Sequence, residues 1–267
     1  MYSKPKKSLG QNFLVDNNIR GKIVASCAFT SQDTLLEVGS GRGELTFLFS
    51  EIVKKLYAVE IDQRIYAHLQ EKLSACSNCL LIKGDILKID LRDLLAKERT
   101  EEKIKVFGNI PYYISSPLLE YFINSRDLIS EIFITVQKEY ALRLVASAGS
   151  KSYGSLSCFV QYYLEPELLF NIKKNSFFPA PKVDSSFLRL KVRRKNPWAV
   201  ADEGLFFKII RGAFNQRRKT LRNSLEGVIP QQSLDDFFKL SGVDKNIRPE
   251  ALSLADFAAL SNLIKKS

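Results

Sequence analysis

Short apolar runs alternate with segments of helical pattern between Asp33 and Gln137, and this alternation limits the possible folds more than any other feature of the sequence. The runs have the length of buried strands, and several of the segments between them have the length of helices. The predicted strands cover residues 34–38, 56–61, 79–83, 103–107 and 131–136, and the clearest helices cover 44–54, 62–74 and a stretch that ends near 146. This pattern predicts a parallel α/β sheet. Right-handed crossovers then place the ends of its strands along one edge, where open sheets bind ligands.

The part of the chain after Gly149 has a different pattern. Runs at 156–163 and 183–192 are typical of hairpin strands, and a loop with prolines at 177–181 lies between them. From Asp202 onwards the sequence predicts only helices, which cover residues 205–214, 220–225, 233–240 and 253–263.

A domain boundary is therefore expected near residues 193–197. We expect an α/β domain over residues 1–195 and a small all-helical C-terminal domain over residues 196–267.

The charge balance favours a polyanionic partner. The chain has 40 Lys and Arg residues against 29 Asp and Glu residues, a net charge of +11. Cationic side chains that neutralise phosphates release counterions, so nucleic acid is the favoured partner over a plain solvated basic surface. Basic residues cluster near 4–7, 189–195 and 211–222. The expected RNA-binding residues, all in the third cluster, are Arg211, Arg217, Arg218, Lys219 and Arg222.

Several other classes of protein are disfavoured. No apolar run approaches the roughly 20 residues of a membrane span, and the basic N-terminus lacks the apolar core of a signal peptide. Cys76-x-x-Cys79 is a single cysteine pair and His68 is the only histidine, so we expect reduced thiols, no metal site and no catalytic triad. The expected location is the cytoplasm.

A glycine-rich loop follows the first predicted strand, where the backbone of such folds passes close to a ligand. It reads Glu37-Val-Gly39-Ser-Gly41-Arg-Gly43. Glu44 replaces the last glycine of the dinucleotide fingerprint, and an acid near a helix N-terminus disfavours a pyrophosphate there. This argues against an NAD-dependent dehydrogenase and favours S-adenosylmethionine, which has a cationic sulfonium and no phosphate, at Gly39 and Gly41. The alternative is a tight turn with no ligand.

Carboxylates end the next two predicted strands. Glu60 lies 21 residues after Gly39, where a carboxylate can accept hydrogen bonds from both ribose hydroxyls of a cofactor. Asp85 ends the third predicted strand, where its carboxylate can accept a hydrogen bond from the adenine amine of the cofactor. Each could instead cap the following helix.

The fourth predicted strand runs into Asn109-Ile110-Pro111-Tyr112. One target that such a motif can serve is the N6 amine of an adenine base. This amine is a poor nucleophile, because its lone pair is delocalised into the ring. The amide oxygen of Asn109 and the carbonyl of Ile110 offer acceptors for both amine hydrogens, Pro111 stiffens the turn, and Tyr112 supplies a stacking face for a flipped base. Catalysis would be positioning and electrostatics without a strong base. The alternative is an ordinary turn with a core tyrosine.

Phe177-Phe178-Pro179-Ala180-Pro181 is a second aromatic element. Phe177 or Phe178 could stack on the opposite face of the target adenine, held by a loop that prolines stiffen. The alternative is that these rings only pack in the hydrophobic core.

The chain resembles the ribosomal RNA adenine dimethyltransferase family, and most closely its bacterial small-subunit (16S) branch. The segments that carry the resemblance are 7–14, 36–46, 59–62, 84–85, 109–112, 177–185 and 217–222. A small departure is Ser40-Gly-Arg42, where many relatives have Pro-Gly-Leu. The resemblance implies a class I S-adenosylmethionine-dependent methyltransferase fold, Rossmann-like, with a helical C-terminal domain.

The same resemblance implies roles for single residues. Asn12 and Leu14 would close over the cofactor beside Asn109, and Phe177 would sandwich the base with Tyr112. The implied substrate is a pair of adjacent adenosines in the 3′-terminal hairpin loop of 16S rRNA, within a small-subunit precursor particle, with two methyl groups added to each. A role in small-subunit biogenesis and a monomeric enzyme are expected.

Two rivals remain. One is the resistance-type relative that dimethylates a single adenosine of large-subunit rRNA, although the segment 217–222 and the helical tail favour the small-subunit branch. The other is a ribosome-assembly factor that uses the fold mainly for binding.

Overall fold

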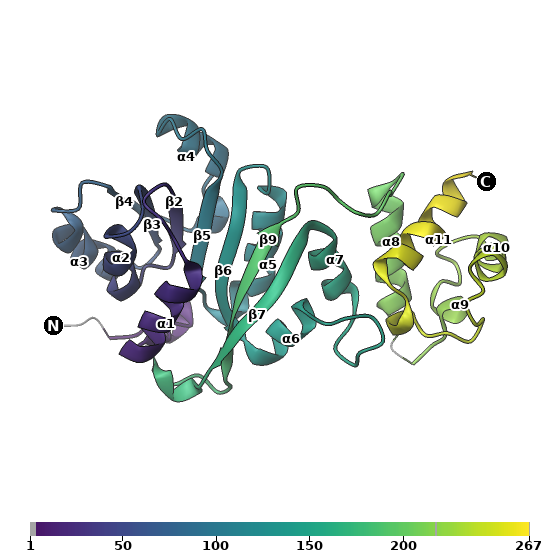
Figure 1. Ribbon diagram of the computed structural model, residues 1–267. Helices are drawn as coiled ribbons and strands as arrows, with labels where there is room; N and C mark the ends of the chain where they lie inside the picture. The colour runs from purple at the N-terminus through teal and green to yellow at the C-terminus, as the bar shows by residue number, and fades with distance from the viewer. Residues whose placement is uncertain (1–3, 217, 267) are drawn as a thin grey trace. The chain divides into compact units, whose positions relative to one another are not determined.

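The computed structural model describes residues 4–216 and 218–266 (Figure 1). These residues form two compact units. The first unit consists of the chain up to Ala141 together with Glu165–Val192, and the second consists of Leu142–Leu164 together with the chain after Val192. The helical unit thus includes residues 142–164 in addition to the stretch expected from the sequence.

A seven-stranded sheet in the order β4-β3-β2-β5-β6-β9-β7 is built from described residues of this chain, and Figure 1 shows β2 to β6 side by side. Its strands are β2 (Thr34–Val38), β3 (Lys55–Glu60), β4 (Cys79–Lys83), β5 (Ile104–Asn109), β6 (Ile129–Gln137), β7 (Leu164–Ile172) and β9 (Ser185–Val192). Strands β2 to β6 pair in parallel, and β9 is antiparallel to β6. All residues of β2 are buried, as in an inner strand of a sheet covered on both faces. The five predicted strands are confirmed.

Capping aspartates start three helices of the first unit. These pairs are Asp16 with α1 (Asn17–Cys27), Asp62 with α3 (Gln63–Leu73) and Asp90 with α4 (Leu91–Lys97). Each carboxylate accepts a hydrogen bond from a backbone N–H group of the first turn, which a helix leaves unpaired. The remaining helices are α2 (Glu44–Ser50), α5 (Ser115–Asn124) and α6 (Lys138–Leu144).

A separate two-stranded sheet joins distant parts of the chain. β1 (Phe13–Leu14) pairs antiparallel with β8 (Phe177–Phe178), so that Phe13 lies opposite Phe178 and Leu14 opposite Phe177. The residues that follow the N-terminus and the proline-rich loop therefore meet, although the sequence separates them widely.

Phenylalanine rings form much of the core next to β2 and β5. The rings belong to Phe29, Phe49, Phe107, Phe133 and Phe187. Phe49 of α2 is completely buried, and its ring centre lies 5.2 Å from Phe29 and 4.9 Å from Phe107, both edge to face. This geometry is the favoured one for aromatic pairs.

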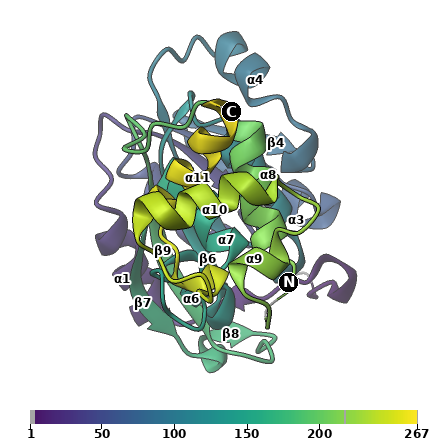
Figure 2. The same cartoon turned by 90° about the vertical axis from the view of Figure 1, so that its right-hand side faces the viewer.

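Helices form the second unit, which Figure 2 shows with α10 and α11 side by side. They are α7 (Ser155–Tyr163), α8 (Glu203–Phe214), α9 (Leu221–Ser224), α10 (Gln231–Ser241) and α11 (Leu254–Lys266). The four helices predicted after Asp202 are confirmed.

The predicted strand at 156–163 is wrong, because these residues form α7. Cys158 and Tyr162, four residues apart, lie on the buried face of the helix, and the Tyr162 ring centre is 5.0 Å from that of Phe206 in α8. The backbone N–H of Gly154 donates to Ser157 Oγ at 3.1 Å and stabilises the first turn. Packing against α8 thus outweighs the strand preference of the aromatic and β-branched residues.

Within residues 4–216 and 218–266, no helix has the length and apolar character needed to cross a membrane. The same described residues contain no group of three or more His, Cys, Asp or Glu side chains placed to hold a metal ion.

Candidate active site

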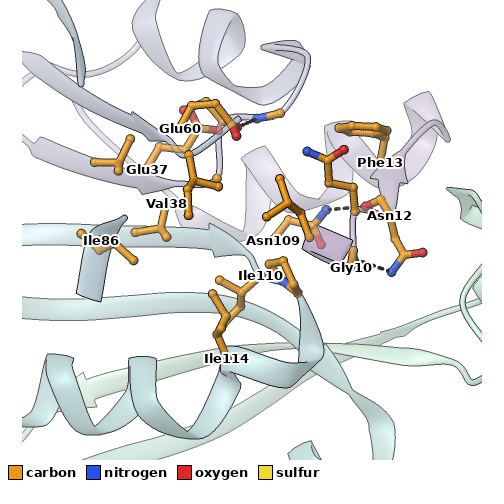
Figure 3. Close-up of a pocket in the computed structure, with 18 of the residues that line it drawn as sticks. Gly10, Asn12, Phe13, Glu37, Val38, Glu60, Ile86, Asn109, Ile110 and Ile114 are labelled. Carbon is orange, nitrogen blue, oxygen red and sulfur yellow. Dashed lines mark hydrogen bonds between the residues drawn. The ribbon is translucent and has the colours of Figure 1, made fainter. Parts of the chain in front are cut away.

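A cavity of about 360 Å³ lies where β2, β3, β4 and β5 end (Figure 3). The sequence-predicted cofactor-binding and catalytic residues all line it. They are Asn12, Leu14, Gly39, Gly41, Glu60, Asp85, Asn109, Pro111, Tyr112 and Phe177. The structure therefore brings together residues that lie up to two thirds of the chain apart.

The glycine loop after β2 requires glycine for conformation and for space. Gly41 has a φ of +57°, in the left-handed region. Gly43 has a φ of +86°, and a Cβ there would lie 2.6 Å from Leu69 Cδ2. The backbone N–H of Gly39 donates to the carbonyl of Val59 in β3 at 2.9 Å, which fixes the loop over the end of the sheet.

Glu60 links this loop to β3. Its Oε2 accepts from the backbone N–H of Gly41 at 2.9 Å, and its Oε1 accepts from the backbone N–H of Asp62 at 2.8 Å. Burial raises the pKa of the Glu60 carboxyl. Each oxygen keeps a further lone pair, so the carboxylate can hold the loop and still accept from a ligand.

Asp85 caps η2 (Ile86–Lys88) by accepting from the backbone N–H of Leu87 at 3.1 Å, and it also lines the cavity. Capping and ligand binding, which the sequence left as alternatives, are thus compatible in this geometry.

Glu37 is a lining residue to which the sequence analysis gave no role. Its side chain is 2% exposed, and Oε2 has no hydrogen-bond partner among the described residues. Burial raises the pKa of its carboxyl to about 7. A buried anionic carboxyl is costly, and the charge of a cationic ligand in the cavity would lower that cost. The sequence feature that could have indicated a role for Glu37 is its position between Leu36 and Val38, in a strand that is otherwise largely apolar.

Asn109, at the end of β5, is held by the N-terminal segment. Its Nδ2 donates to the backbone carbonyl of Asn12 at 3.3 Å. Figure 3 shows Asn109 and Asn12 on one side of the cavity and Glu37 and Glu60 on the other. The amide therefore lies within the same cavity as the acidic groups.

Tyr112 begins η3 (Tyr112–Ile114), directly after Pro111. Its hydroxyl shares a hydrogen bond of 2.6 Å with Ser185 Oγ of β9, and burial raises the pKa of the phenol. The hydrogen bond fixes the plane of a ring that lines the cavity.

Phe177 and Phe178 have different environments. Phe177 is 4% exposed and lines the cavity beside Leu14, whereas Phe178 is 55% exposed. Of the two aromatic candidates, Phe177 is the one in contact with the cavity.

The charged residues of the cavity lining are mainly acidic. The carboxylates belong to Glu37, Glu44, Glu60 and Asp85. Arg20 is the basic side chain in this described lining; it donates from Nε to the Leu14 carbonyl at 3.0 Å, and its Nη2 lies 3.4 Å from Glu44. Such a surface suits a cationic ligand and disfavours a pyrophosphate.

Comparison with known proteins identifies the family. The model of the ribosomal RNA adenine dimethylase family matches residues 2–266. The chain belongs to this family. It is therefore an rRNA adenine dimethyltransferase, and its cofactor is S-adenosylmethionine.

Curated relatives of this adenine dimethylase match along nearly the whole chain. It is 39% identical to the ribosomal RNA small subunit methyltransferase A of Clostridioides difficile (strain 630) over 263 residues, which cover 98% of this chain and 91% of the relative. It is 40% identical to the protein of the same name from Geobacillus thermodenitrificans over 265 residues, covering 97% of this chain and 90% of the relative.

Solved structures agree on the fold. A dimethyladenosine transferase from Plasmodium falciparum superposes with a TM-score of 0.77 at 25% identity, covering 95% of this chain and 98% of that one. The 23S rRNA methyltransferase ErmE superposes with a TM-score of 0.76 at 22% identity over 95% of this chain and 100% of its own. The class I methyltransferase fold expected from the resemblance is confirmed.

The basic residues expected to bind RNA lie in the second unit. Arg211 is in the last turn of α8, and Arg218 and Lys219 are exposed in the turn that follows. Arg222 forms an ion pair with Asp235 and lies over the ring of Phe238, so it also has a structural contact. Arg217 lies outside the described residues.

Proposed function

We propose that this enzyme dimethylates the N6 amines of two adjacent adenosines in the 3′-terminal hairpin loop of small-subunit (16S) rRNA. The observation that carries the proposal is the match of about 40% identity to small-subunit methyltransferases over both units, including the helical one. The cavity supports the proposal, because the amide of Asn109 and the rings of Tyr112 and Phe177 all line it.

The roles of the lining residues follow from their chemistry. S-adenosylmethionine, when bound, supplies an electrophilic methyl group. Glu60 accepts from its ribose, Asp85 from its adenine amine, and Asn12, Leu14, Gly39 and Gly41 enclose it. These assignments fit a cavity whose charged lining residues are mainly acidic.

The target amine is activated by position. The Asn109 oxygen and the Ile110 carbonyl accept the two amine hydrogens, which biases the nitrogen towards a tetrahedral form with its lone pair directed at the methyl group. Tyr112 and Phe177 stack on the flipped base, and Pro111 stiffens the turn. The bound cofactor would supply the methyl group to this nitrogen, and the ammonium that results would lose its proton to solvent.

The partner is 16S rRNA in a small-subunit precursor particle, bound by the exposed basic residues of the second unit. The enzyme acts as a monomer in the cytoplasm and takes part in small-subunit biogenesis. The net charge of +11 supports an RNA partner.

Mapping of modified adenosines tests the substrate. Deletion of the gene should remove dimethyladenosine from the 3′-terminal hairpin of 16S rRNA, and the purified enzyme should methylate immature small-subunit particles. Activity only on large-subunit rRNA would overturn the assignment. Particle binding without methyl transfer would instead indicate an assembly factor.

We expect the double variant Arg218→Ala/Lys219→Ala to bind the precursor particle about tenfold more weakly, since each lost phosphate contact weakens binding and lowers the salt dependence by about one unit of slope. Equilibrium binding at several salt concentrations measures both quantities. The control Lys88→Ala/Lys97→Ala removes the same charge from exposed positions of the first unit. Equal losses of particle affinity in the two double variants would mean that only the net charge matters, and would contradict a specific role for Arg218 and Lys219.

We expect cofactor affinity to rise between about pH 6 and pH 8, because the Glu37 carboxyl, with its pKa raised to about 7 by burial, becomes anionic in this range. The anion stabilises a cationic ligand, whereas the protonated acid does not. Glu37→Gln should lose this rise and bind about tenfold more weakly at pH 8. Calorimetric titration with S-adenosylmethionine measures the affinity, with the exposed Glu51→Gln as control. Identical pH profiles for wild type and Glu37→Gln would refute the assignment.

A further inference from the structure

The carboxylate of Asp62 is completely shielded from solvent and joins α3 to the N-terminal segment (residues 4–14). Its Oδ1 lies 3.2 Å from Lys6 Nζ, and its Oδ2 accepts from Gln11 Nε2 at 3.2 Å. Arg64 donates to both oxygens and lowers the pKa of Asp62, so the group is anionic at neutral pH.

These contacts fold the N-terminal segment into a fixed turn. The backbone N–H of Lys6 donates to Gln11 Oε1 at 2.8 Å, so Gln11 uses one end of its amide for Lys6 and the other for Asp62. Arg64 Nη2 donates to the carbonyl of Lys4 at 3.2 Å. Gln11 and Asn12 are then held at the wall of the cavity.

The position of Asn12 determines the orientation of Asn109. A backbone carbonyl can only accept, so the contact of 3.3 Å between Asn12 O and Asn109 Nδ2 assigns the amide nitrogen to the N-terminal segment. The amide oxygen of Asn109 is thereby directed away from Asn12. If the carbonyl of Asn12 moved away, this hydrogen bond would no longer favour the orientation that directs the Asn109 oxygen away from Asn12 over the flipped one.

We propose that Asp62 is a positioning residue for methyl transfer: through Gln11 and Lys6 it holds the N-terminal segment across the cofactor cavity, where the Asn12 carbonyl orients the catalytic amide of Asn109. The effect of Asp62 on cofactor binding requires only that the cofactor occupies the cavity that the N-terminal segment lines. The role of Asp62 towards Asn109 rests on the proposed function.

Helix capping alone does not account for the contacts of Asp62. Asp90 caps α4 through the backbone N–H groups of Arg92 and Asp93. Asp62 caps α3 through the backbone N–H of Arg64, and in addition it contacts residues more than 50 positions away in the sequence. Since Asn caps helices about as well as Asp, an Asp→Asn change keeps the cap and removes the charge.

The test is the rate of cofactor release from the full-length chain. In stopped-flow experiments with S-adenosylhomocysteine, Asp62→Asn should release the ligand about tenfold faster with an association rate that is not reduced, because the closed position of the segment is less populated. Asp90→Asn is the matched control and should release it at the wild-type rate. Partial unfolding would lower the amount of binding protein, not the lifetime of the complex.

Gln11→Ala is the second variant, because it leaves Asp62 and the α3 cap intact if Asp62→Asn fails to fold. It should also release the ligand faster, and it should lower kcat at saturating cofactor and RNA about tenfold. Wild-type release rates in the variants would overturn the proposal, and an unchanged kcat in Gln11→Ala would overturn its Asn109 step. An incorrect RNA substrate would leave the release rates altered, so the two failures are distinguishable.

Discussion

Replacement of Asn109 by alanine is expected to lower kcat for methyl transfer about 100- to 1,000-fold at saturating RNA and cofactor. A preorganised polar group aimed at developing charge has an effect of this size, and Asn109 is fixed in place by the Asn12 carbonyl at 3.3 Å. Binding of the RNA particle should stay near wild type, because the expected RNA contacts lie in the second unit. Single-turnover transfer and particle binding, measured on the same preparation, separate the two effects.

Asn124→Ala is the control for Asn109→Ala. Asn124 ends α5, is exposed and does not line the active-site cavity, so its loss should leave kcat unchanged. Wild-type turnover in Asn109→Ala would mean that the reaction centre has been misassigned.

Phe49→Ala should destabilise the first unit by about 3–5 kcal/mol, the usual cost of a large cavity in a packed core. Its ring is fully buried and meets Phe29 and Phe107 edge to face. Hydrogen exchange of amides in β2 and β5 measures the loss in this unit directly.

The neighbouring Leu48→Ala is the matched control for Phe49→Ala. Leu48 is 38% exposed on the same helix, so its removal should cost far less. Equal losses for the two variants would contradict a core that depends on the phenylalanine cluster.

The sheet was predictable from the sequence because local pattern and burial agree there. Inner parallel strands such as β2 are covered on both faces and so appear as continuous apolar runs. β7 was missed for the opposite reason. It contains Pro166 and has several residues that are not buried, and it lies at the end of the strand order, where a proline is tolerated.

Sequence also identified the lining residues that stand at strand ends, because a parallel sheet places those ends together. Glu37 escaped notice because its importance depends on the absence of a partner for Oε2 among the described residues, which only the folded cavity determines. The network of Asp62 escaped notice because Lys6 and Gln11 lie 56 and 51 positions away along the chain. No local pattern specifies such contacts.

The pairing of β1 with β8 has a consequence for the order in which the protein matures during synthesis. Phe13 and Leu14 leave the ribosome early, whereas their partners Phe178 and Phe177 follow only after most of the sheet has been made. The wall of the cavity that contains Leu14 is therefore completed late in translation. An enzyme that modifies ribosomal RNA thus depends on a ribosome having synthesised about two thirds of its chain before the proposed cofactor cavity is complete.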